Sequence, residues 1–294
     1  MATLSQWAAG ARPRTLPAAV APVVLGTAAA HLLGRADAAL AILALVVALA
    51  LQVGVNYAND YSDGIRGTDE ARVGPVRLVG QRLADPRNVK VAAFLSFGAG
   101  ALAGLALVAL SGAWLLLPLG GLAVLAAWRY TGGDNPYGYR GLGEVYVFVF
   151  FGLMATLGTE YTQADTISWF GVLAAVGVGA VASAILVANN LRDIPTDTVH
   201  GKQTLAVRLG DHRTRILYTV LIGVSLLTLL LMALSTVWAL LGLLAVPLAV
   251  RNGRTVMGDA TGRDLVPVLV RTGLYEVAYA VLIAIGVVIG VALR

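Results

Sequence analysis

The sequence predicts an all-α, polytopic membrane protein built from nine transmembrane helices. Three observations carry this prediction. Of the 294 residues, 58% are hydrophobic and 13% are charged, about half the charged fraction of a typical soluble domain. Apolar runs recur along the whole chain, each near the roughly 20 residues that cross a bilayer core. The runs are continuously apolar rather than alternating, which disfavours a transmembrane β-barrel.

The nine runs are separated by polar or basic breaks, and the eighth run is the shortest and contains Pro247. Long polar loops precede the third, fifth, seventh and ninth runs, at about 60–88, 132–144, 191–213 and 251–271. We expect transmembrane helices over 16–33, 38–58, 89–110, 113–131, 145–161, 168–190, 214–234, 236–250 and 272–293.

The basic residues orient the predicted bundle. With a cytoplasmic N-terminus, all of the 21 Lys and Arg residues except Arg35 and Arg294 fall on inside segments, as the positive-inside rule requires. The formal net charge of +5 therefore reflects membrane orientation and does not indicate a nucleic-acid partner. We expect residues 1–294 to form one integral domain of the cell membrane, surrounded by lipid, with its active site facing the cytoplasm.

The second run ends in an acidic cluster, "NYANDYSDGIRGTD" (56–69). Asn56, Asp60 and Asp63 are spaced i, i+4 and i+7, which places them on one face of a helix. Asp69 follows Gly67, and its position suits a loop residue as well as a ligand.

A second cluster ends the sixth run, in "VANNLRDIPTD" (187–197). Asn189, Asp193 and Asp197 are spaced i, i+4 and i+8. Pro195 is expected to break the helix before Asp197, because proline lacks a backbone donor. Each cluster contains Asn-x3-Asp, which weakly suggests two related four-helix halves with the ninth helix added.

Both helices reach the cytoplasmic face with their C-termini, the negative ends of their dipoles. Aspartates there are unfavourable unless a cation binds, and oxygen ligands favour Mg²⁺, which uses one or two carboxylates together with substrate phosphates. A single Asp just past a membrane helix is commonly a solvated loop residue. Two clusters of matched spacing favour function, since polar residues within membrane segments are rare and usually functional. We therefore expect a Mg²⁺-bound diphosphate between the clusters.

Basic and aromatic residues accompany the acidic clusters. Lys202 and Arg208, in "HGKQTLAVRLG" (200–210), could bind phosphate oxygens, although both also fit the positive-inside pattern. The loop "RYTGGDNPYGYRGLGE" (129–144) contributes Tyr130, Tyr139 and Arg140. Aromatic faces stabilise cations, and tyrosines also form the interfacial belt of membrane proteins, so both interpretations stay open here.

Together these motifs resemble the UbiA-type intramembrane aromatic prenyltransferases. Asn-Asp-x2-Asp at 59–63, Asp-x3-Asp at 193–197 and the trailing Lys202 carry the likeness. With "GARPRTLPAAVAPVVLG" (10–26), "GPVRLVGQ" (74–81) and "YTGGDNPYGYRGLGE" (130–144), the chain is similar to the branch of that family that prenylates 1,4-dihydroxy-2-naphthoate in menaquinone biosynthesis. The family's first motif continues to an Asp where this chain has Gly67 and next Asp69, a shift that fits the naphthoate branch.

The resemblance implies nine helices around a central cavity that opens sideways into the lipid. It also implies transfer of a polyprenyl group from polyprenyl diphosphate to 1,4-dihydroxy-2-naphthoate, with loss of CO₂ and diphosphate and with Mg²⁺ as cofactor, giving demethylmenaquinone. The implied metal ligands are Asp60, Asp63, Asp193 and Asp197, which form the catalytic set with Lys202. The implied substrate-binding residues are Asn56, Asn59, Asn189, Asn190, Arg140, Tyr130, Tyr139 and Arg208.

Two alternatives stay open on the sequence. Another aromatic acceptor, such as 4-hydroxybenzoate or homogentisate, would keep the enzyme class. A secondary transporter would instead carry its polar residues near the bilayer midplane, whereas these clusters lie at helix ends. The 34 glycines permit close helix packing, within one chain or between chains.

Overall fold

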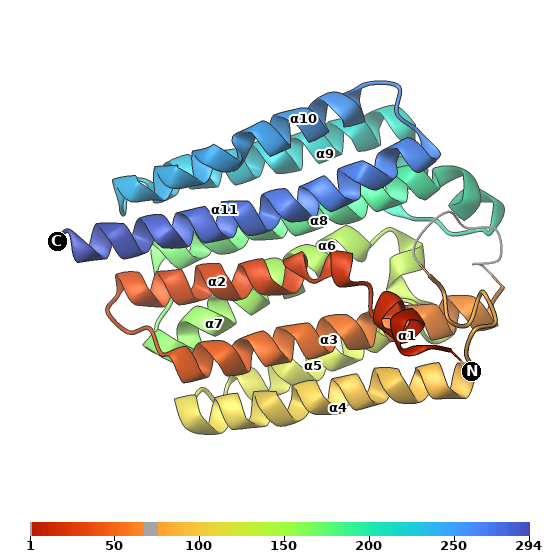
Figure 1. The fold of residues 1–294 in the computed structure, drawn as a ribbon, viewed down its shortest axis with the longest axis horizontal. Helices are drawn as coiled ribbons and strands as arrows, with labels where there is room; N and C mark the ends of the chain where they lie inside the picture. The colour runs from red at the N-terminus through yellow and green to blue at the C-terminus, as the bar shows by residue number, and fades with distance from the viewer. Residues whose placement is uncertain (1, 68–75) are drawn as a thin grey trace.

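The computed structural model describes residues 2–67 and 76–294, which form a bundle of helices without strands in these ranges (Figure 1). The α-helices are α1 (Leu4–Gly10), α2 (Pro17–Leu32), α3 (Ala38–Ile65), α4 (Pro86–Ser111), α5 (Leu116–Arg129), α6 (Gly143–Val147), α7 (Ala155–Ala164), α8 (Trp169–Val199), α9 (Leu205–Met232), α10 (Val246–Met257) and α11 (Val266–Ala292). Short 3₁₀ helices are η1 (Pro13–Thr15), η2 (Tyr137–Arg140), η4 (Val237–Ala245) and η5 (Gly262–Leu265), and η3 (Phe148–Met154) is a π-helix that joins α6 to α7.

Helical structure coincides with every predicted apolar run, and the all-α membrane class is confirmed. Six helical stretches within the described ranges are long and apolar enough to cross a membrane, and a seventh is the pair formed by Leu4–Thr15 and Pro17–Leu32, which is bent by 51°. The predicted count of nine is not confirmed by this criterion, because α5 has only 14 residues and the eighth run is divided between η4 and α10.

Two helices run further than predicted, and both carry the acidic clusters. α3 ends at Ile65 rather than 58, and α8 ends at Val199 rather than 190. The expectation that Pro195 breaks the helix is wrong, since Pro195 lies inside α8. Nearby hydroxyls support the final turns: Thr196 and Thr198 donate to the carbonyls of Asp193 and Ile194, at 3.0 and 2.8 Å.

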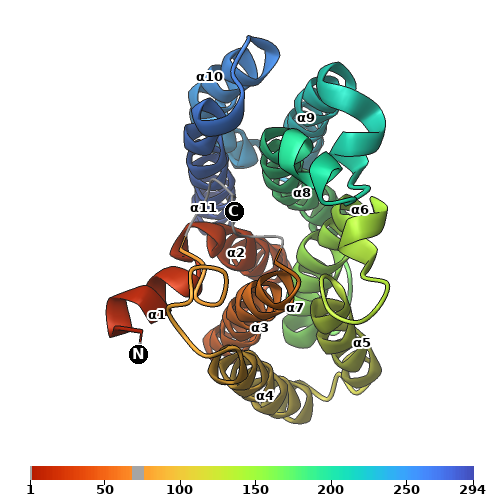
Figure 2. The same cartoon turned by 90° about the vertical axis from the view of Figure 1, so that its right-hand side faces the viewer.

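α8 lies at the centre of the bundle and packs against α9, α11, α2 and η3. Figure 2, which looks along the bundle, shows α8 between α9 and α6, and α3 between α2 and α4. Glycine allows the closest approach: a Cβ at Gly152 of η3 would lie 2.6 Å from the Gly179 Cα of α8. Such contacts between small residues are a usual means of helix association in membranes.

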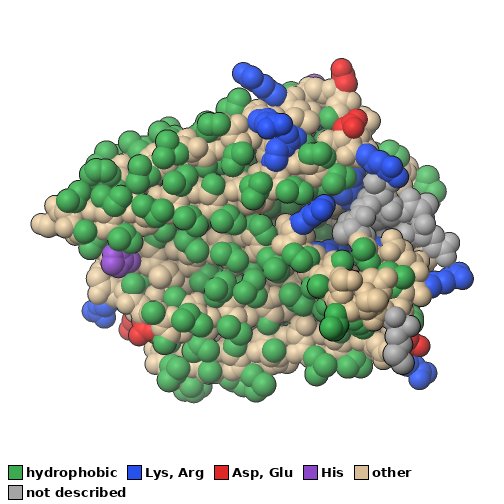
Figure 3. All heavy atoms as spheres, viewed as in Figure 1, with side chains coloured by type: hydrophobic (Ala, Val, Ile, Leu, Met, Phe, Trp, Pro, Cys, Tyr) green, Lys and Arg blue, Asp and Glu red, His purple; other side chains and the backbone are tan. Residues whose placement is uncertain are grey.

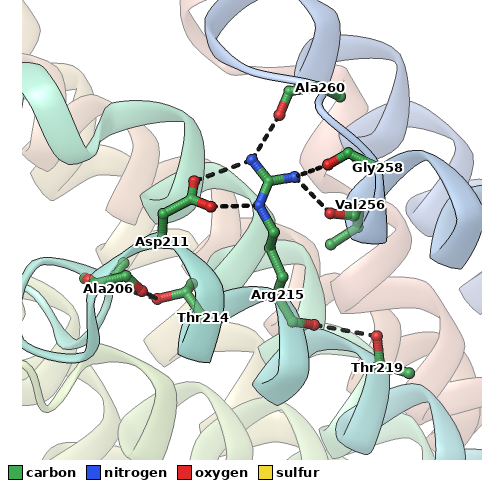
Figure 4. A network of polar contacts seen from close by, with 9 residues as sticks. Ala206, Asp211, Thr214, Arg215, Thr219, Val256, Gly258 and Ala260 are labelled. Carbon is green, nitrogen blue, oxygen red and sulfur yellow. Dashed lines mark hydrogen bonds and ion pairs between the residues drawn. The ribbon is translucent and has the colours of Figure 1, made fainter.

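Polar side chains join α9 to its neighbours. Between α9 and α11, the hydroxyl pairs Tyr218–Thr272 and Ser225–Tyr275 lie 2.8 and 2.9 Å apart. Nearer the start of α9, the guanidinium of Arg215 donates to the backbone carbonyls of Val256, Gly258 and Ala260, at 2.5, 2.7 and 2.9 Å, and pairs with Asp211 (Figure 4). Arg215 thereby fixes the end of α10 and the segment that leads to α11.

Charge is concentrated at one end of the molecule. Figure 3 shows hydrophobic side chains over the long middle of the visible face, with most Lys and Arg side chains near the end where α10 turns into α11. The same end holds the last residues of α3 and α8 (Figure 1). This distribution is that of a multi-pass membrane protein with one basic face.

Candidate active site

A large cavity runs through the bundle beside α3, with a volume of about 1760 Å³. Its α3 lining recurs every three or four residues, from Ala44 through Ala48, Gln52 and Asn56 to Asp63. Nineteen residues separate the first and last of these, so the cavity extends about 28 Å along the helix at 1.5 Å per residue. The volume exceeds the roughly 300–1,000 Å³ of a pocket for a drug-sized ligand, and the length approaches the thickness of the bilayer core.

The two ends of this cavity differ in chemistry. The far end is apolar, with lining residues that include Ala44, Val47, Leu105 and Leu117. The other end, called the head end below, carries the charged lining residues Arg12, Arg14, Asp63, Arg77, Arg192, Asp197, Lys202 and Arg263. Such a cavity suits a ligand with an anionic head and a long apolar chain.

Asp63 lies at the centre of the best-defined contacts of the head end. It accepts a short hydrogen bond from the Tyr139 hydroxyl, and the Lys202 Nζ lies 3.4 Å from its Oδ1. The same ammonium sits over the Tyr139 ring, 4.4 Å from its centroid. The three residues come from α3, η2 and the segment between α8 and α9, and the structure brings them together as predicted for one site.

Asp60 and Asp193 have a different orientation, and neither lines the cavity. The Asp60 carboxylate accepts the backbone N–H groups of Leu78 and Val79, at 2.7 and 3.0 Å. Asp193 pairs side by side with Arg192, at 2.6 and 2.7 Å. Asp60 therefore holds the segment that contains Arg77, and Asp193 holds the side chain of Arg192. Both arginines line the head end of the cavity.

The four predicted asparagines all line the cavity. Asn56 donates to the Ala11 carbonyl and to Thr15, at 2.8 and 2.9 Å, which ties the N-terminal segment to α3. Asn59 accepts from Thr131 at 2.8 Å, and Asn189 accepts from the Arg192 guanidinium at 2.9 Å. Asn190 donates to the buried carboxylate of Glu144 at 2.9 Å.

An aromatic wall forms near the head end from Tyr130, Tyr137 and Tyr146, all of which line the cavity. The Tyr137 and Tyr146 rings stack at 3.8 Å between centroids, and the Tyr130 ring meets Tyr137 edge-on at 5.4 Å. Burial, and the neighbouring Tyr130 and Tyr146, raise the pKa of Tyr137 well above its ordinary value. Tyr137 therefore stays neutral, and the ring faces of this wall can stabilise a cation.

Two predicted residues lie elsewhere, and one lies outside the described ranges. Arg140 and Arg208 are exposed, and neither lines the cavity. Asp69 belongs to residues 68–75, which the structure does not describe.

The arginines of the head end are functional candidates that the sequence motifs did not indicate. Arg12, Arg77 and Arg192 were counted only toward membrane orientation, although each stands inside or beside a motif quoted above. Burial in the folded chain distinguishes them from ordinary loop cations, since Arg77 and Arg192 are only 6% and 7% exposed. A buried arginine is expected to have an anionic partner.

The residues of the head end fit a magnesium ion. Within the described ranges no group of three or more His, Cys, Asp or Glu side chains converges on one point. Mg²⁺ does not require such a group, because it is commonly held by one or two carboxylates, with substrate phosphates and water completing its shell. Asp63 of α3 and Asp197 of α8 both line the cavity and could supply those two carboxylates.

Fold and site together define a polytopic helical membrane protein in which one cavity joins a cationic end to a long apolar channel. Residues 19–264 match the UbiA prenyltransferase family, and the chain belongs to this family.

Named relatives and a solved structure support this assignment. The chain is 56% identical to the 1,4-dihydroxy-2-naphthoate octaprenyltransferase of Mycobacterium tuberculosis, over 97% of each chain. It is 41% identical to the protein of the same name from Escherichia coli, over 90% of this chain and 89% of the relative. The fold is similar to a UbiA homologue from Archaeoglobus fulgidus bound to GPP and Mg²⁺, with a TM-score of 0.65, 12% identity and coverage of 95% and 99% of the two chains.

Proposed function

We propose that this protein transfers a polyprenyl group from polyprenyl diphosphate to 1,4-dihydroxy-2-naphthoate, in a Mg²⁺-dependent reaction at the cytoplasmic side of the cell membrane. The observation that carries the proposal is the large cavity that joins a cationic head end to an apolar channel about 28 Å long. The acceptor is chosen because relatives at 56% and 41% identity bear the name of that activity. A bound prenyl diphosphate and Mg²⁺ in the A. fulgidus homologue support the donor and the ion.

In this proposal the donor lies with its diphosphate at the head end and its tail in the apolar channel. Asp63 and Asp197 would hold the Mg²⁺, which supplies neutralisation of the leaving diphosphate. Asp60 and Asp193, first expected to be ligands as well, act through the cations that they position, Arg77 and Arg192.

Bond cleavage separates charge, and the head end is built to stabilise both products. The C–O bond of the donor breaks with its electron pair on the diphosphate, whose negative charge is stabilised by Lys202, Arg77 and Arg192. The allylic carbocation is left beside the faces of Tyr130 and Tyr137. Apolar walls exclude water, which would otherwise capture this cation.

Carbon–carbon bond formation completes the transfer. The ring carbon of the acceptor that bears the carboxylate attacks the allylic cation, and loss of CO₂ returns the electron pair to the ring. The product is a prenylated 1,4-naphthalenediol, the reduced form of demethylmenaquinone. Hydroxyl groups of the acceptor can hydrogen-bond to Asn190 or Asn59, whose side chains line the cavity.

One assay tests the whole proposal. Purified protein is incubated with Mg²⁺, a polyprenyl diphosphate and a panel of aromatic acids, and prenylated products are identified by mass. We expect a product only from the naphthoate, lighter by CO₂ than the simple adduct. A product from 4-hydroxybenzoate or homogentisate instead would refute the acceptor, and no product from any acid would refute prenyl transfer.

A further inference from the structure

The far end of the cavity is lined by glycines that have no packing function. Among them are Gly104 of α4, Gly120 of α5 and Gly158 of α7. A Cβ added at Gly104 would meet only the Val47 side chain, at 3.8 Å, and a Cβ at Gly120 or Gly158 would meet nothing within 4 Å. Each position therefore faces open space.

Other glycines of this chain lie where helices pack closely and a side chain would not fit. A Cβ at Gly26 would lie 2.4 Å from the Thr156 carbonyl oxygen, and a Cβ at Gly54 would lie 2.5 Å from the Phe97 ring. These residues let helices approach closely. Glycine in a helix interior is destabilising by about 1 kcal/mol relative to alanine, and at the three cavity positions no helix contact offsets that cost.

The position of Gly104 can be expressed as a distance from the head end. Gly104 faces Val47, which precedes Asp63 on α3 by 16 residues, or about 24 Å. A carbon chain advances about 1.2 Å per bond, as in an extended backbone whose three bonds span 3.3–3.6 Å. An isoprene unit adds four chain bonds, about 5 Å, so a two-unit tail ends near 10 Å and a fifth unit reaches Gly104.

We propose that Gly104, Gly120 and Gly158 keep the far end of the cavity open for the fifth and following isoprene units, and so determine the preference for long prenyl donors. The inference deepens the proposed function and rests on it, because it assigns the apolar channel to the donor tail. It further specifies the donor class as prenyl diphosphates of at least five units.

The test compares a two-unit and an eight-unit prenyl diphosphate with the wild-type protein, Gly104→Ala and Gly104→Leu. Leucine at 104 fills the channel beyond the reach of the short tail. We expect kcat/KM for the eight-unit donor to fall at least tenfold in Gly104→Leu and less in Gly104→Ala. The value for the two-unit donor should stay within twofold of the wild type.

Gly98→Leu is the matched control. Gly98 lies on the same helix, is exposed, and has no atom within 4 Å of an added Cβ, but it does not line the cavity. It should leave both donors within twofold of the wild type. Gly120→Leu repeats the test from another helix, so that misfolding of one variant, checked by size exclusion in detergent, does not decide the result.

The outcomes separate this inference from the proposed function. Equal losses with both donors in Gly104→Leu and Gly120→Leu, or no loss with either donor, would overturn the role of the glycines while wild-type transfer stands. A wild-type protein that uses neither donor would refute the proposed function itself.

Discussion

Replacement of Arg215 should destabilise the end of the bundle that carries the head end, without any contact to the cavity. In Arg215→Met the carbonyls of Val256, Gly258 and Ala260 lose their donor. The Arg215 side chain is 7% exposed, whereas Asp211 is 56% exposed. An exposed ion pair contributes about 0–1 kcal/mol, and hydrogen bonds to a charged group contribute about 1.5–3 kcal/mol each. The carbonyl contacts therefore dominate.

Because the three hydrogen bonds share one guanidinium, their energies do not add, and we expect Arg215→Met to lose about 3–5 kcal/mol, more than one such bond and less than the full sum of three. That loss corresponds to a decrease of roughly 6–20 °C in the unfolding temperature, at about 2–4 °C per kcal/mol.

Thermal unfolding of the purified protein in one detergent provides the measurement, with Asp211→Asn and Arg213→Met as controls. Arg213 is exposed and lies two residues earlier on α9, so its replacement should change the unfolding temperature by less than about 2 °C. If the ion pair contributes little to stability, Asp211→Asn should also change the unfolding temperature by less than about 2 °C. The reasoning fails if Asp211→Asn is as destabilising as Arg215→Met, or if Arg215→Met unfolds at the wild-type temperature.

Three further predictions concern the head end. Asp63→Asn should lower kcat by roughly 10²–10³-fold, the scale of removing one electrostatic group from a reaction centre. A variant that keeps the wild-type kcat throughout a Mg²⁺ titration would contradict the role of Asp63. Removal of Mg²⁺ with a chelator should abolish product formation, and added Mg²⁺ should restore it; turnover that persists after chelation would exclude the ion. The raised pKa of Tyr137 means that the folded state retains a proton that the unfolded state releases above about pH 10. Stability should therefore be complete below pH 10 and decrease above it, and Tyr137→Phe should reduce that decrease in pH-dependent unfolding; an unchanged profile would contradict the assignment.

Hydropathy located the helices well but placed the ends of α3 and α8 too early. The apolar run stops before Asn59, Asp60 and Asp63, yet all three are buried within the last turns of α3, as their helical spacing suggests. The same error shortened α8 at Asn190 and Asp193. A hydropathy pattern cannot separate a polar loop from a helix end that lines a polar cavity, because both replace apolar residues with polar ones.

The acidic motifs indicated two helices that line the cavity, α3 and α8, but not which of their carboxylates face it. Spacing places Asn56, Asp60 and Asp63 within one arc of α3, since 3.6 residues complete each turn. Asp60 nevertheless turns to the N–H groups of Leu78 and Val79. The orientation of Asp60 depends on where the segment before α4 packs. This packing is a tertiary contact that the periodicity of the sequence does not predict.

The head end of the cavity is lined by more cations than carboxylates, although the sequence motifs that indicated it are acidic. Six cations and two carboxylates line it among the described residues, Arg12, Arg14, Arg77, Arg192, Lys202 and Arg263 against Asp63 and Asp197, a formal balance of +4. A diphosphate ester bears about one negative charge more than the −1.5 to −2 of a phosphate monoester, so the lining nearly matches it. At about 5 Å and an effective dielectric constant near 20, each added cation contributes about 3 kcal/mol of attraction. The motifs mark where a metal ion could bind, and the arginines and the lysine of the chain itself would share with that ion the neutralisation of the leaving group.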